Sequence, residues 1–549
     1  MSPDPSQSAG RASAWVAAAV LFALGFALYA RTLGYEFVNW DDPAEVVENP
    51  WIRAVTLENL ESIFSEPILD AYFPLMTVSF MVDHALWGLD PRGFHLQSVL
   101  LNALNGALAF WVLAQLTRQR ALAFVAALLW CAHHTHVESV AWVSGRKEVL
   151  ATSLLLGSLG FFLRAREVAP LRRGAYAASI ALFGLAAAAK LTIGSYALFF
   201  ALADWSLRER RAPQAREPLW RHVAIALPHV FAALPVVIMN SVVQRTILTP
   251  EQLGLFDYVL VRGQAAWRYL WLLLGLLPGQ PLYDLPPISH QPALVVATLF
   301  PLLAPLVAFA FALRRKYTNA ALALAWLVIG LLAPLVFPLV TYMADRYLYA
   351  PSLGFCWLLA SGIVALAFAP SRPRVWNAAT AVLLTAPPLL WFALLAWSMT
   401  PVWRNSEALW TRAVATSRDG RAFDALATVL AREGRTEEAE RVLDSGPATA
   451  RGYTQLAIAY AEQKRIHDAL RATDGGIEAA RTQVLLRPQD GATLYSVRGV
   501  VLWMLGRPAD ATKAWHEALA IDPAEPGARA ALGAIERGED PGAAIQPPP

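Results

Sequence analysis

The stretch "ASAWVAAAVLFALGFALYA", Ala12–Ala30, is an uncharged apolar run, and "YEFVNWDDPAEVVENP", Tyr35–Pro50, follows it almost at once. A run of about 20 apolar residues is long enough to cross a bilayer as a helix. No small-residue cleavage site precedes the polar stretch, so we interpret the run as a retained helix that also acts as a signal anchor. The adjacent Asp41 and Asp42 therefore stand where the chain leaves the membrane.

The composition of the whole chain supports this interpretation. Of its 549 residues, 56% are hydrophobic and 16% are charged, and the mean hydropathy is +0.41. Soluble domains carry about 25% charged residues, so the chain is predicted to be a polytopic membrane protein. The net charge of +3 is small and dispersed, which argues against a nucleic-acid partner. Cys131 and Cys356 lie within apolar runs and indicate neither a disulfide framework nor a cysteine metal site.

Twelve apolar segments are candidate spans. They are 14–30, 94–117, 121–138, 148–165, 174–190, 191–207, 222–240, 259–278, 292–313, 319–340, 346–369 and 376–398. Short basic connections favour the cytoplasmic side. Five such connections stand out: Arg118 with Arg120, Arg164 to Arg173, Arg208 to Arg221, Arg314 to Lys316, and Arg372 with Arg374.

The segment 259–278 decides the number of crossings. With the N-terminus inside, the last two basic connections fall inside only if this segment does not cross fully. It carries Arg262 and Arg268 and ends in a Pro-rich stretch, which favours an interfacial or re-entrant position. We therefore predict eleven crossings and an outer C-terminus. Three polar segments, 31–93, 133–147 and 340–352, then share the outer face and predict a site there.

The chain changes character after residue 398. Three similar stretches align on Gly434, Lys464 and Gly506, and each is followed five residues later by alanine, namely Ala439, Ala469 and Ala511. The mean spacing is close to the ~34-residue tetratricopeptide period. We predict a membrane domain at 1–398 with its first outer loop at 31–93, a tetratricopeptide-repeat domain at 399–536, and a disordered tail at 537–549.

Asp41 and Asp42 are the first candidate catalytic residues. Aspartate is also common at helix caps and in turns, which is the structural alternative for this pair. Two neighbouring carboxylates can divide the work of general base catalysis, one taking a proton from an attacking hydroxyl and the other orienting it. Trp40 beside them suits an interfacial or sugar-facing wall.

The segment "CAHHTHVESVAWVSGRKEVL" is the second polar turn. Its histidines, His133, His134 and His136, do not have the His-Glu-x-x-His spacing of a zinc helix. They are either interfacial anchors or part of an active-site turn. In the second case Glu138 is a second carboxylate, and Arg146 and Lys147 bind an anion. A metal ligand set is a third reading with less support.

Basic residues elsewhere complete the predicted site. Lys190 interrupts an apolar run, where a charge faces a cavity unless it reaches the interface. Asp345 and Arg346 begin another apolar segment and form either a local ion pair or a phosphate-binding site. Carboxylates with cations near a membrane fit a lipid-phosphate-linked donor. The sequence has no P-loop or Gly-rich nucleotide fingerprint in a strand–helix setting.

Four motifs in order, "NWDDPAEVVENP", "HHTHVESVAWVSGRKEVL", "AKLTIGSYALFFALADW" and "ADRYLYAPSLGF", are followed by the repeats. Together they resemble the transmembrane and tetratricopeptide-repeat-containing O-mannosyltransferases and their bacterial relatives. The resemblance covers nearly the whole chain. It implies an all-α glycosyltransferase of the GT-C type, a multi-spanning helix bundle with an outward active site that uses a polyprenyl-phosphate sugar.

The resemblance also implies roles for residues. Asp41 or Asp42 is the base, Glu138 and Arg146 belong to the second outer loop of the site, and Lys190 and Arg346 lie near the donor phosphate. The remaining candidates for substrate binding are Trp40, His134, Asp345 and Tyr349.

The predicted function follows from these assignments. The chain transfers mannose or another hexose to a hydroxyl, such as Ser or Thr of a protein presented by the repeats, at the outer face of a bacterial inner membrane. No cofactor is assigned, and a divalent cation is left open without a ligand motif to support it. Two alternatives are a polymerase or flippase for lipid-linked polysaccharide and a non-enzymatic membrane-anchored assembly factor.

Overall fold

The computed structural model describes residues 5–68, 72–167, 170–208, 217–244, 255–285, 292–336, 341–368, 374–482 and 488–541. The chain forms two compact units, Met1–Pro281 with Leu285–Asn405, and Leu282–Asp284 with Ser406–Pro549. Every element in the described ranges is a helix, which confirms the predicted all-α fold. Parts of the basic connections at 208–221 and 372–374, and most of the predicted tail at 537–549, lie outside the described residues.

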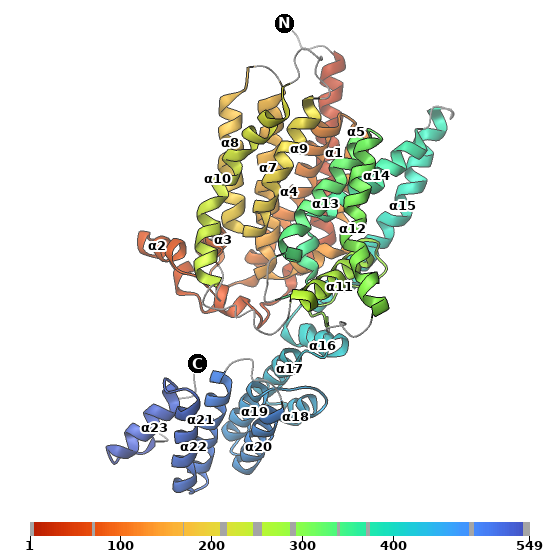
Figure 1. Cartoon of the computed structure of the whole chain (residues 1–549). Helices are drawn as coiled ribbons and strands as arrows, with labels where there is room; N and C mark the ends of the chain where they lie inside the picture. The colour runs from red at the N-terminus through yellow and green to blue at the C-terminus, as the bar shows by residue number, and fades with distance from the viewer. Residues whose placement is uncertain are drawn as a thin grey trace. The chain divides into compact units, whose positions relative to one another are not determined.

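The first unit is a bundle of apolar helices (Figure 1). Six are long and apolar enough to span a membrane: α1 (Pro5–Tyr29), α4 (Pro91–Thr117), α7 (Arg146–Arg166), α10 (Leu219–Gln244), α13 (Thr318–Val336) and α15 (Arg374–Met399). Five apolar stretches are shorter and lie in α5 (Arg120–Cys131), α8 (Arg173–Ala189), η6 (Leu191–Tyr196) with α9 (Ala197–Arg208), α12 (Pro292–Arg314) and α14 (Ser352–Ala367). Together these make eleven apolar helical segments among the described residues, the number predicted for the crossings.

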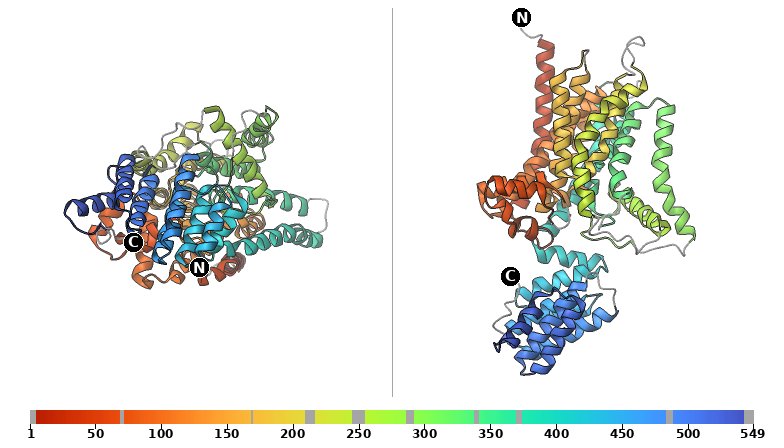
Figure 2. Two further views of the ribbon diagram at one scale, coloured as in Figure 1. Left: turned by 90° about the horizontal axis from the view of Figure 1, so that it is seen from below. Right: turned by 60° about the vertical axis from the view of Figure 1, so that its left-hand side comes forward.

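Helix α11 (Leu255–Leu273) belongs to neither set. Asp257, Arg262 and Arg268 interrupt its apolar surface. It lies at a steep angle to the bundle helices near one end of the bundle (Figures 1 and 2). This arrangement agrees with the predicted interfacial or re-entrant position of the 259–278 segment.

The first loop, predicted as 31–93, is a folded cap. It contains η1 (Ala30–Gly34), η2 (Pro43–Val47), η3 (Pro50–Ile52), α2 (Leu57–Ser65) and α3 (Pro74–Trp87). Side-chain caps start two of these elements, since Asn49 accepts a hydrogen bond from the Trp51 N–H and Thr56 accepts one from the Asn59 N–H. Buried apolar residues of the cap, of α4 and of the 143–145 turn form one core: Val46, Ile52, Ile63, Met76, Phe80, Met81, Phe94 and Val143.

The segment predicted to span at 121–138 is shorter in the structure, because α5 ends at Cys131. The backbone of His133 is extended, and its side chain caps the next turn by accepting from the Thr135 N–H. Three short turns follow, η4 (His134–His136), α6 (Val137–Ala141) and η5 (Val143–Gly145), before α7 begins. The predicted span 121–138 overlapped the polar segment 133–147, and the structure resolves the overlap in favour of the turn, since the chain leaves the helix before His133.

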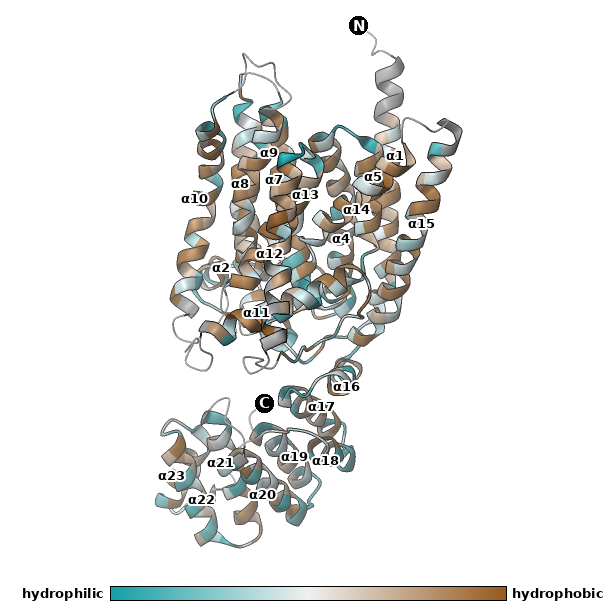
Figure 3. Cartoon of the chain, turned by 45° about the vertical axis from the view of Figure 1, so that its right-hand side comes forward, coloured by the Kyte–Doolittle hydropathy of each residue, from teal (hydrophilic) through white to brown (hydrophobic). Residues whose placement is uncertain are grey.

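Small residues let α1, α4 and α5 pack closely. A Cβ at Gly25 of α1 would lie 3.1 Å from the Ala103 Cα of α4. A Cβ at Gly106 would overlap the Cys131 sulfur of α5. Close backbone approach through small residues is a common way for helices to associate in membranes. Most residues of the bundle helices are hydrophobic, whereas α17–α23 mix hydrophobic and hydrophilic residues (Figure 3).

The second unit consists of helical hairpins. Its helices are α16 (Ser406–Thr416), α17 (Gly420–Arg432), α18 (Thr436–Asp444), α19 (Ala450–Glu462), α20 (Ile466–Thr482), α21 (Pro488–Met504), α22 (Pro508–Ile521) and α23 (Pro526–Glu536). The three residues on which the sequence repeats align, Gly434, Lys464 and Gly506, all have positive φ and form the turns of successive hairpins. The alanine five residues after each is fully buried. This periodicity is consistent with the predicted tetratricopeptide domain.

Candidate active site

Asp42 joins the first loop to the turn before α7. One carboxylate oxygen accepts a hydrogen bond from the Val38 N–H at 2.9 Å. The other accepts from the Ser144 N–H at 3.0 Å and from the Ser144 hydroxyl at 2.5 Å. Its residue surface is 1% exposed, and this burial raises its pKa to about 6 against the lowering effect of these hydrogen bonds. Both oxygens are therefore occupied by contacts that hold the two loops together.

Asp41 has a different environment from its neighbour. Its side chain is 26% exposed, and one carboxylate oxygen lies 3.7 Å from the Lys147 ammonium. Its backbone carbonyl accepts the Glu45 N–H at 2.9 Å, which fixes the residue at the start of η2. Asp41 thus presents a partly accessible carboxylate from a backbone that is held in place.

Lys147 lies between two acidic residues of the first loop. Its side chain is 8% exposed, and its nitrogen is 3.4 Å from a Glu45 oxygen. The ammonium also lies 5.4 Å from the Trp142 ring centroid and 5.1 Å from that of Phe73. Burial raises the pKa of Glu45 to about 7, although the Lys147 charge acts to lower it.

Glu138 and Arg346 form a buried ion pair. The Arg346 backbone N–H donates to one Glu138 oxygen at 2.8 Å, and its guanidinium donates to the other. The guanidinium carbon lies 5.1 Å from the Tyr347 ring centroid and 5.5 Å from that of Trp142. Glu138, predicted to be a second catalytic carboxylate, is thus engaged through both oxygens with the residue predicted to bind phosphate.

Lys190 reaches the same cluster from another direction. It lies in extended conformation between α8 and η6, and its ammonium forms a buried ion pair with Glu148 of α7. The ammonium is 4.9 Å from the Tyr347 ring centroid. Tyr347 therefore touches both Lys190 and Arg346. Glu148 was not singled out in the sequence, because a charge in the first turn of a helix gives no signal of this pairing.

Three tryptophans form an aromatic wall beside these charges. Ring centroids of Trp40 and Trp142 are 5.4 Å apart, and those of Trp142 and Trp403 are also 5.4 Å apart. Trp40 and Trp403 are nearly parallel at 6.2 Å. Trp403 lies in η9 (Thr400–Trp403), directly after α15. The aromatic wall predicted from Trp40 therefore has two further members. Trp142 comes from the second polar turn, and Trp403 was not singled out in the sequence.

Arg146 lies behind the site in an enclosed position. Its guanidinium is fully buried and forms an ion pair with Asp83 at 2.5 Å. It also donates to the Gln97 amide oxygen and to the Phe94 carbonyl. These partners belong to α3 and α4, so Arg146 joins the cap to the bundle.

Tyr349, His134 and Asp345 are also buried. The Tyr349 hydroxyl donates to Asn102 at 2.9 Å and accepts from Asn105 at 3.0 Å. The His134 ring stacks on His133 with centroids 5.1 Å apart, and burial lowers its pKa to about 4. Asp345 packs against Gly279, where an added Cβ would overlap its carboxylate. The contacts described for these three residues are with residues outside the cluster around Asp41 and Lys147, which therefore holds only some of the predicted site residues.

One group of metal-ligating residue types occurs in the described part of the chain. Asp204, Glu217 and His222 have ligand atoms within 4.8 Å of one another. The Arg166 guanidinium donates to Asp204 at 2.7 Å and pairs with Glu217, and His222 contacts Asp204 at 2.5 Å. This group is already an ion-pair network, and it shares no residue with the cluster around Lys147.

Comparisons with known proteins agree with the motifs. The mouse (Mus musculus) protein O-mannosyl-transferase TMTC2 is 32% identical over 157 residues, 27% of this chain and 19% of that protein. Mouse TMTC1 is 34% identical over 26% of this chain and 16% of its own length. Drosophila melanogaster Tmtc3 is 27% identical over 67% of this chain and 47% of its own length. The resemblance to this family is confirmed.

These alignments are partial. The alignments with TMTC2 and TMTC1 span less than a fifth of the relatives' length, and that with Tmtc3 spans about half. No family model matches the chain. Among solved structures, ArnT from Cupriavidus metallidurans bound to undecaprenyl phosphate aligns over 76% of this chain and 80% of its own, with 14% identity and a TM-score of 0.37.

Proposed function

We propose that this chain is an integral-membrane glycosyltransferase that moves a hexose from a polyprenyl-phosphate donor to an acceptor hydroxyl. The observation that carries the proposal is the partly exposed Asp41 carboxylate 3.7 Å from the buried Lys147 ammonium. A base for the acceptor and a cation for the leaving phosphate are then adjacent. The similarity to the protein O-mannosyl-transferases supports the same reaction class.

The proposed reaction is a single displacement. Asp41 takes the proton of the acceptor hydroxyl, whose oxygen forms a bond to the sugar C1. The bond from C1 to the lipid phosphate breaks on the opposite face, and the polyprenyl phosphate leaves with the electron pair. Asp42 does not touch the substrates in this scheme; its hydrogen bonds to Val38 and Ser144 position Asp41.

The position of Lys147 beside the proposed base Asp41 favours it as the residue that meets the departing phosphate. Lys190 and Arg346, to which the sequence assigned this role, are each held in a close buried ion pair, with Glu148 and Glu138. The Lys147 ammonium lies 3.7 Å from Asp41, whose carboxylate is partly exposed, and 3.4 Å from Glu45. Positive charge placed where negative charge develops lowers the barrier most when it is held in position beforehand.

Two features of the structure suit the two parts of such a donor. The wall of three tryptophans suits the sugar, and an apolar cavity suits the polyprenyl chain. Trp40 is part of a three-ring surface beside Lys147, and aromatic rings provide large apolar faces for a sugar. A cavity of about 410 Å³ lies between α11, α12 and α13 and is lined almost entirely by apolar side chains. Tyr269 lines it and accepts a hydrogen bond at 3.4 Å from the Ala344 N–H, two residues before Arg346. We assign this cavity to the polyprenyl chain.

The acceptor in this proposal is a Ser or Thr hydroxyl of a protein. The hairpins of the second unit repeat with the same turn geometry, and stacked hairpins of this kind form concave peptide-binding surfaces. A lipid-linked polysaccharide polymerase or flippase is the rival. In a strain lacking the gene, loss of glycosylated envelope proteins with an intact glycan polymer supports the proposal, and the reverse result supports the rival.

The direct test uses the purified full chain in detergent. Polyprenyl-phosphate mannose labelled in the sugar is supplied with envelope protein from the deletion strain. The proposal predicts label in protein and release of polyprenyl phosphate. A matched reaction with labelled nucleotide mannose should give none. Transfer from the nucleotide sugar and not from the lipid would overturn the assigned donor.

A further inference from the structure

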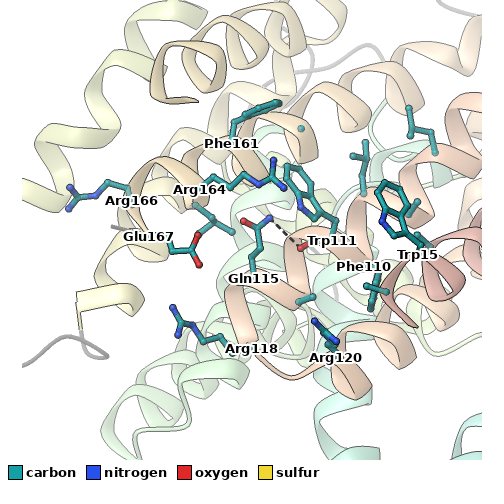
Figure 4. Close-up of a pocket in the computed structure, with 18 of the residues that line it drawn as sticks. Trp15, Phe110, Trp111, Gln115, Arg118, Arg120, Phe161, Arg164, Arg166 and Glu167 are labelled. Atoms are coloured by element: carbon teal, nitrogen blue, oxygen red, sulfur yellow. Dashed lines mark hydrogen bonds between the residues drawn. The ribbon is translucent and has the colours of Figure 1, made fainter. Parts of the chain in front are cut away.

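A second cavity lies at the other end of the bundle helices. It has a volume of about 960 Å³ and lies between α1, α4 and α7. Figure 4 shows its two kinds of lining. The aromatic lining residues include Trp15, Trp111 and Phe161, and the basic ones include Arg118, Arg120 and Arg164.

The cavity is about one membrane thickness from the candidate active site. Arg146 begins α7 behind that site, and Arg164 lies eighteen residues further along the same helix. At ~1.5 Å per residue the two are about 27 Å apart along the helix axis. The hydrocarbon core of a bilayer is about 30 Å thick. The basic lining residues also belong to two of the connections predicted to be cytoplasmic, so the cavity falls at the predicted inner leaflet.

Two of the arginines are available to an anion. The Arg164 guanidinium lies over the Trp111 ring at 5.1 Å, and in Figure 4 it points toward the aromatic side chains. Neither Arg164 nor Arg118 forms an ion pair with any residue that the structure describes. Arg166 differs, since Asp204 and Glu217 bind its guanidinium, which points away from the aromatic residues. Among the described lining residues the one carboxylate is that of Glu167.

The cavity is open toward the surface that a bilayer would cover. Trp15 of α1 lines it and is 77% exposed, and the neighbouring Val16 and Val20 are also exposed. These residues lie in a helix with the length and composition of a membrane span. A ligand here therefore meets apolar helix surface along its length and arginines at one end.

We propose that this cavity binds an anionic glycerophospholipid of the inner leaflet. The phosphate lies between Arg118 and Arg164, and an acyl chain packs along Trp111 and Phe161. An arginine guanidinium can donate two parallel hydrogen bonds to the oxygens of one phosphate. Basic pockets between membrane helices on the cytoplasmic side bind anionic headgroups. This site is separate from the proposed donor site and does not depend on the proposed reaction.

Native mass spectrometry of the full chain in detergent tests the proposal. The probes are dioleoyl-phosphatidylglycerol and dioleoyl-phosphatidylcholine at equal concentration. We expect the anionic lipid to bind roughly tenfold more tightly or better, because the trimethylammonium group of phosphatidylcholine offsets its phosphate charge beside the two arginines, whereas phosphatidylglycerol keeps a net negative charge. Inorganic phosphate in tenfold molar excess should leave it bound. Equal binding of the two lipids, or displacement by phosphate, would overturn the proposal.

Matched variants locate the site. Arg118→Gln with Arg164→Gln should bring phosphatidylglycerol binding down to the phosphatidylcholine level. Arg172→Gln with Arg173→Gln removes the same charge from exposed residues at the same end that do not line the cavity, and binding should persist. Equal loss in both double variants would show a general charge effect and contradict the site.

A filling variant keeps the arginines in place. A Cβ added at Gly157, which lines the cavity, meets only Leu182 at 3.5 Å, an ordinary contact. Gly157→Leu should therefore fold and narrow the cavity, with at least a severalfold loss of phosphatidylglycerol binding. If the arginine variant does not fold, this variant decides the question. Full binding by Gly157→Leu would rule out the cavity as the lipid site.

Discussion

The Asp41 carboxylate lies 3.7 Å from the Lys147 ammonium and keeps about a quarter of its side chain exposed, whereas its neighbour in the sequence is buried. This relationship separates the roles of two adjacent aspartates that look equivalent in the sequence. Asp42 fills its hydrogen-bonding capacity with Val38 and Ser144. One aspartate is thus available for chemistry while the other holds the loop.

Asp42→Asn should mainly reduce stability. An amide has one acceptor oxygen, so its NH₂ group must face either the Val38 N–H or the donors of Ser144. A buried donor left without a partner costs about 1–3 kcal/mol, and we expect a loss of this size in the free energy of unfolding. Denaturant unfolding in detergent measures it. A variant as stable as the wild type would contradict the anchoring role of Asp42.

Glu138→Gln should destabilise the protein strongly because it leaves the Arg346 charge buried. Removing one member of a buried ion pair typically costs about 3–5 kcal/mol. Replacing both residues with methionine should restore a large part of the loss, since neither charge remains. Arg507→Gln, which breaks an exposed pair with Asp510, is the control and should change stability by less than about 1 kcal/mol. A Glu138→Gln effect as small as that of the control would contradict the assignment of Glu138 and Arg346 as a buried ion pair.

The stability of the cap should depend on pH through Glu45. Burial raises the pKa of Glu45 to about 7 from an ordinary value of 4.5, so the folded state binds its proton more tightly than the unfolded state. The resulting stabilisation is present in full below about pH 4.5 and is lost as the pH rises through about 7. The stability of the wild type relative to Glu45→Gln should therefore fall between pH 5 and pH 8. A difference that is constant or that rises over this range would contradict the raised pKa.

If the polyprenyl chain lies in the cavity between α11, α12 and α13, narrowing that cavity should affect long-chain donors most. Ala304 lines this cavity. Ala304→Phe should raise the KM for a long polyprenyl-phosphate mannose several times more than the KM for a short-chain analogue. Ala308 lies on the same helix, is exposed and does not line the cavity, so Ala308→Phe is the matched control. An equal effect of Ala304→Phe on both donors would place the lipid chain elsewhere.

The sequence predicted the bundle well because apolar length and basic connections are local signals. The count of eleven apolar segments and the exclusion of the 259–278 segment both rest on such signals. The end of α5 at Cys131 was placed too late, although the polar segment from residue 133 was recognised, because the boundary depends on the local backbone: His133 is extended and its side chain caps the next turn.

The site was less predictable because pairing between charges is a long-range property. The sequence placed Lys190 within an apolar run, Glu138 in an outer polar turn and Arg346 at the start of an apolar segment. Only the fold shows that each is paired and that Glu148 is a partner. Arg146 and Lys147 are adjacent in the sequence, yet the first faces Asp83 in the core and the second faces Asp41. A one-residue step around a helix start separates these directions, and charge alone carries no information about it.

The central claim is that Asp41 is the catalytic base. The most direct measurement is the initial rate of label transfer from polyprenyl-phosphate mannose by purified Asp41→Asn and Asp42→Asn, each corrected for its folded fraction. A positioned general base contributes about 10²–10⁴-fold to the rate. Asp41→Asn should therefore lose at least about 100-fold in kcat while its free energy of unfolding stays unchanged. Folded Asp42→Asn should retain more activity than folded Asp41→Asn. Transfer by folded Asp41→Asn at the wild-type rate would contradict the account.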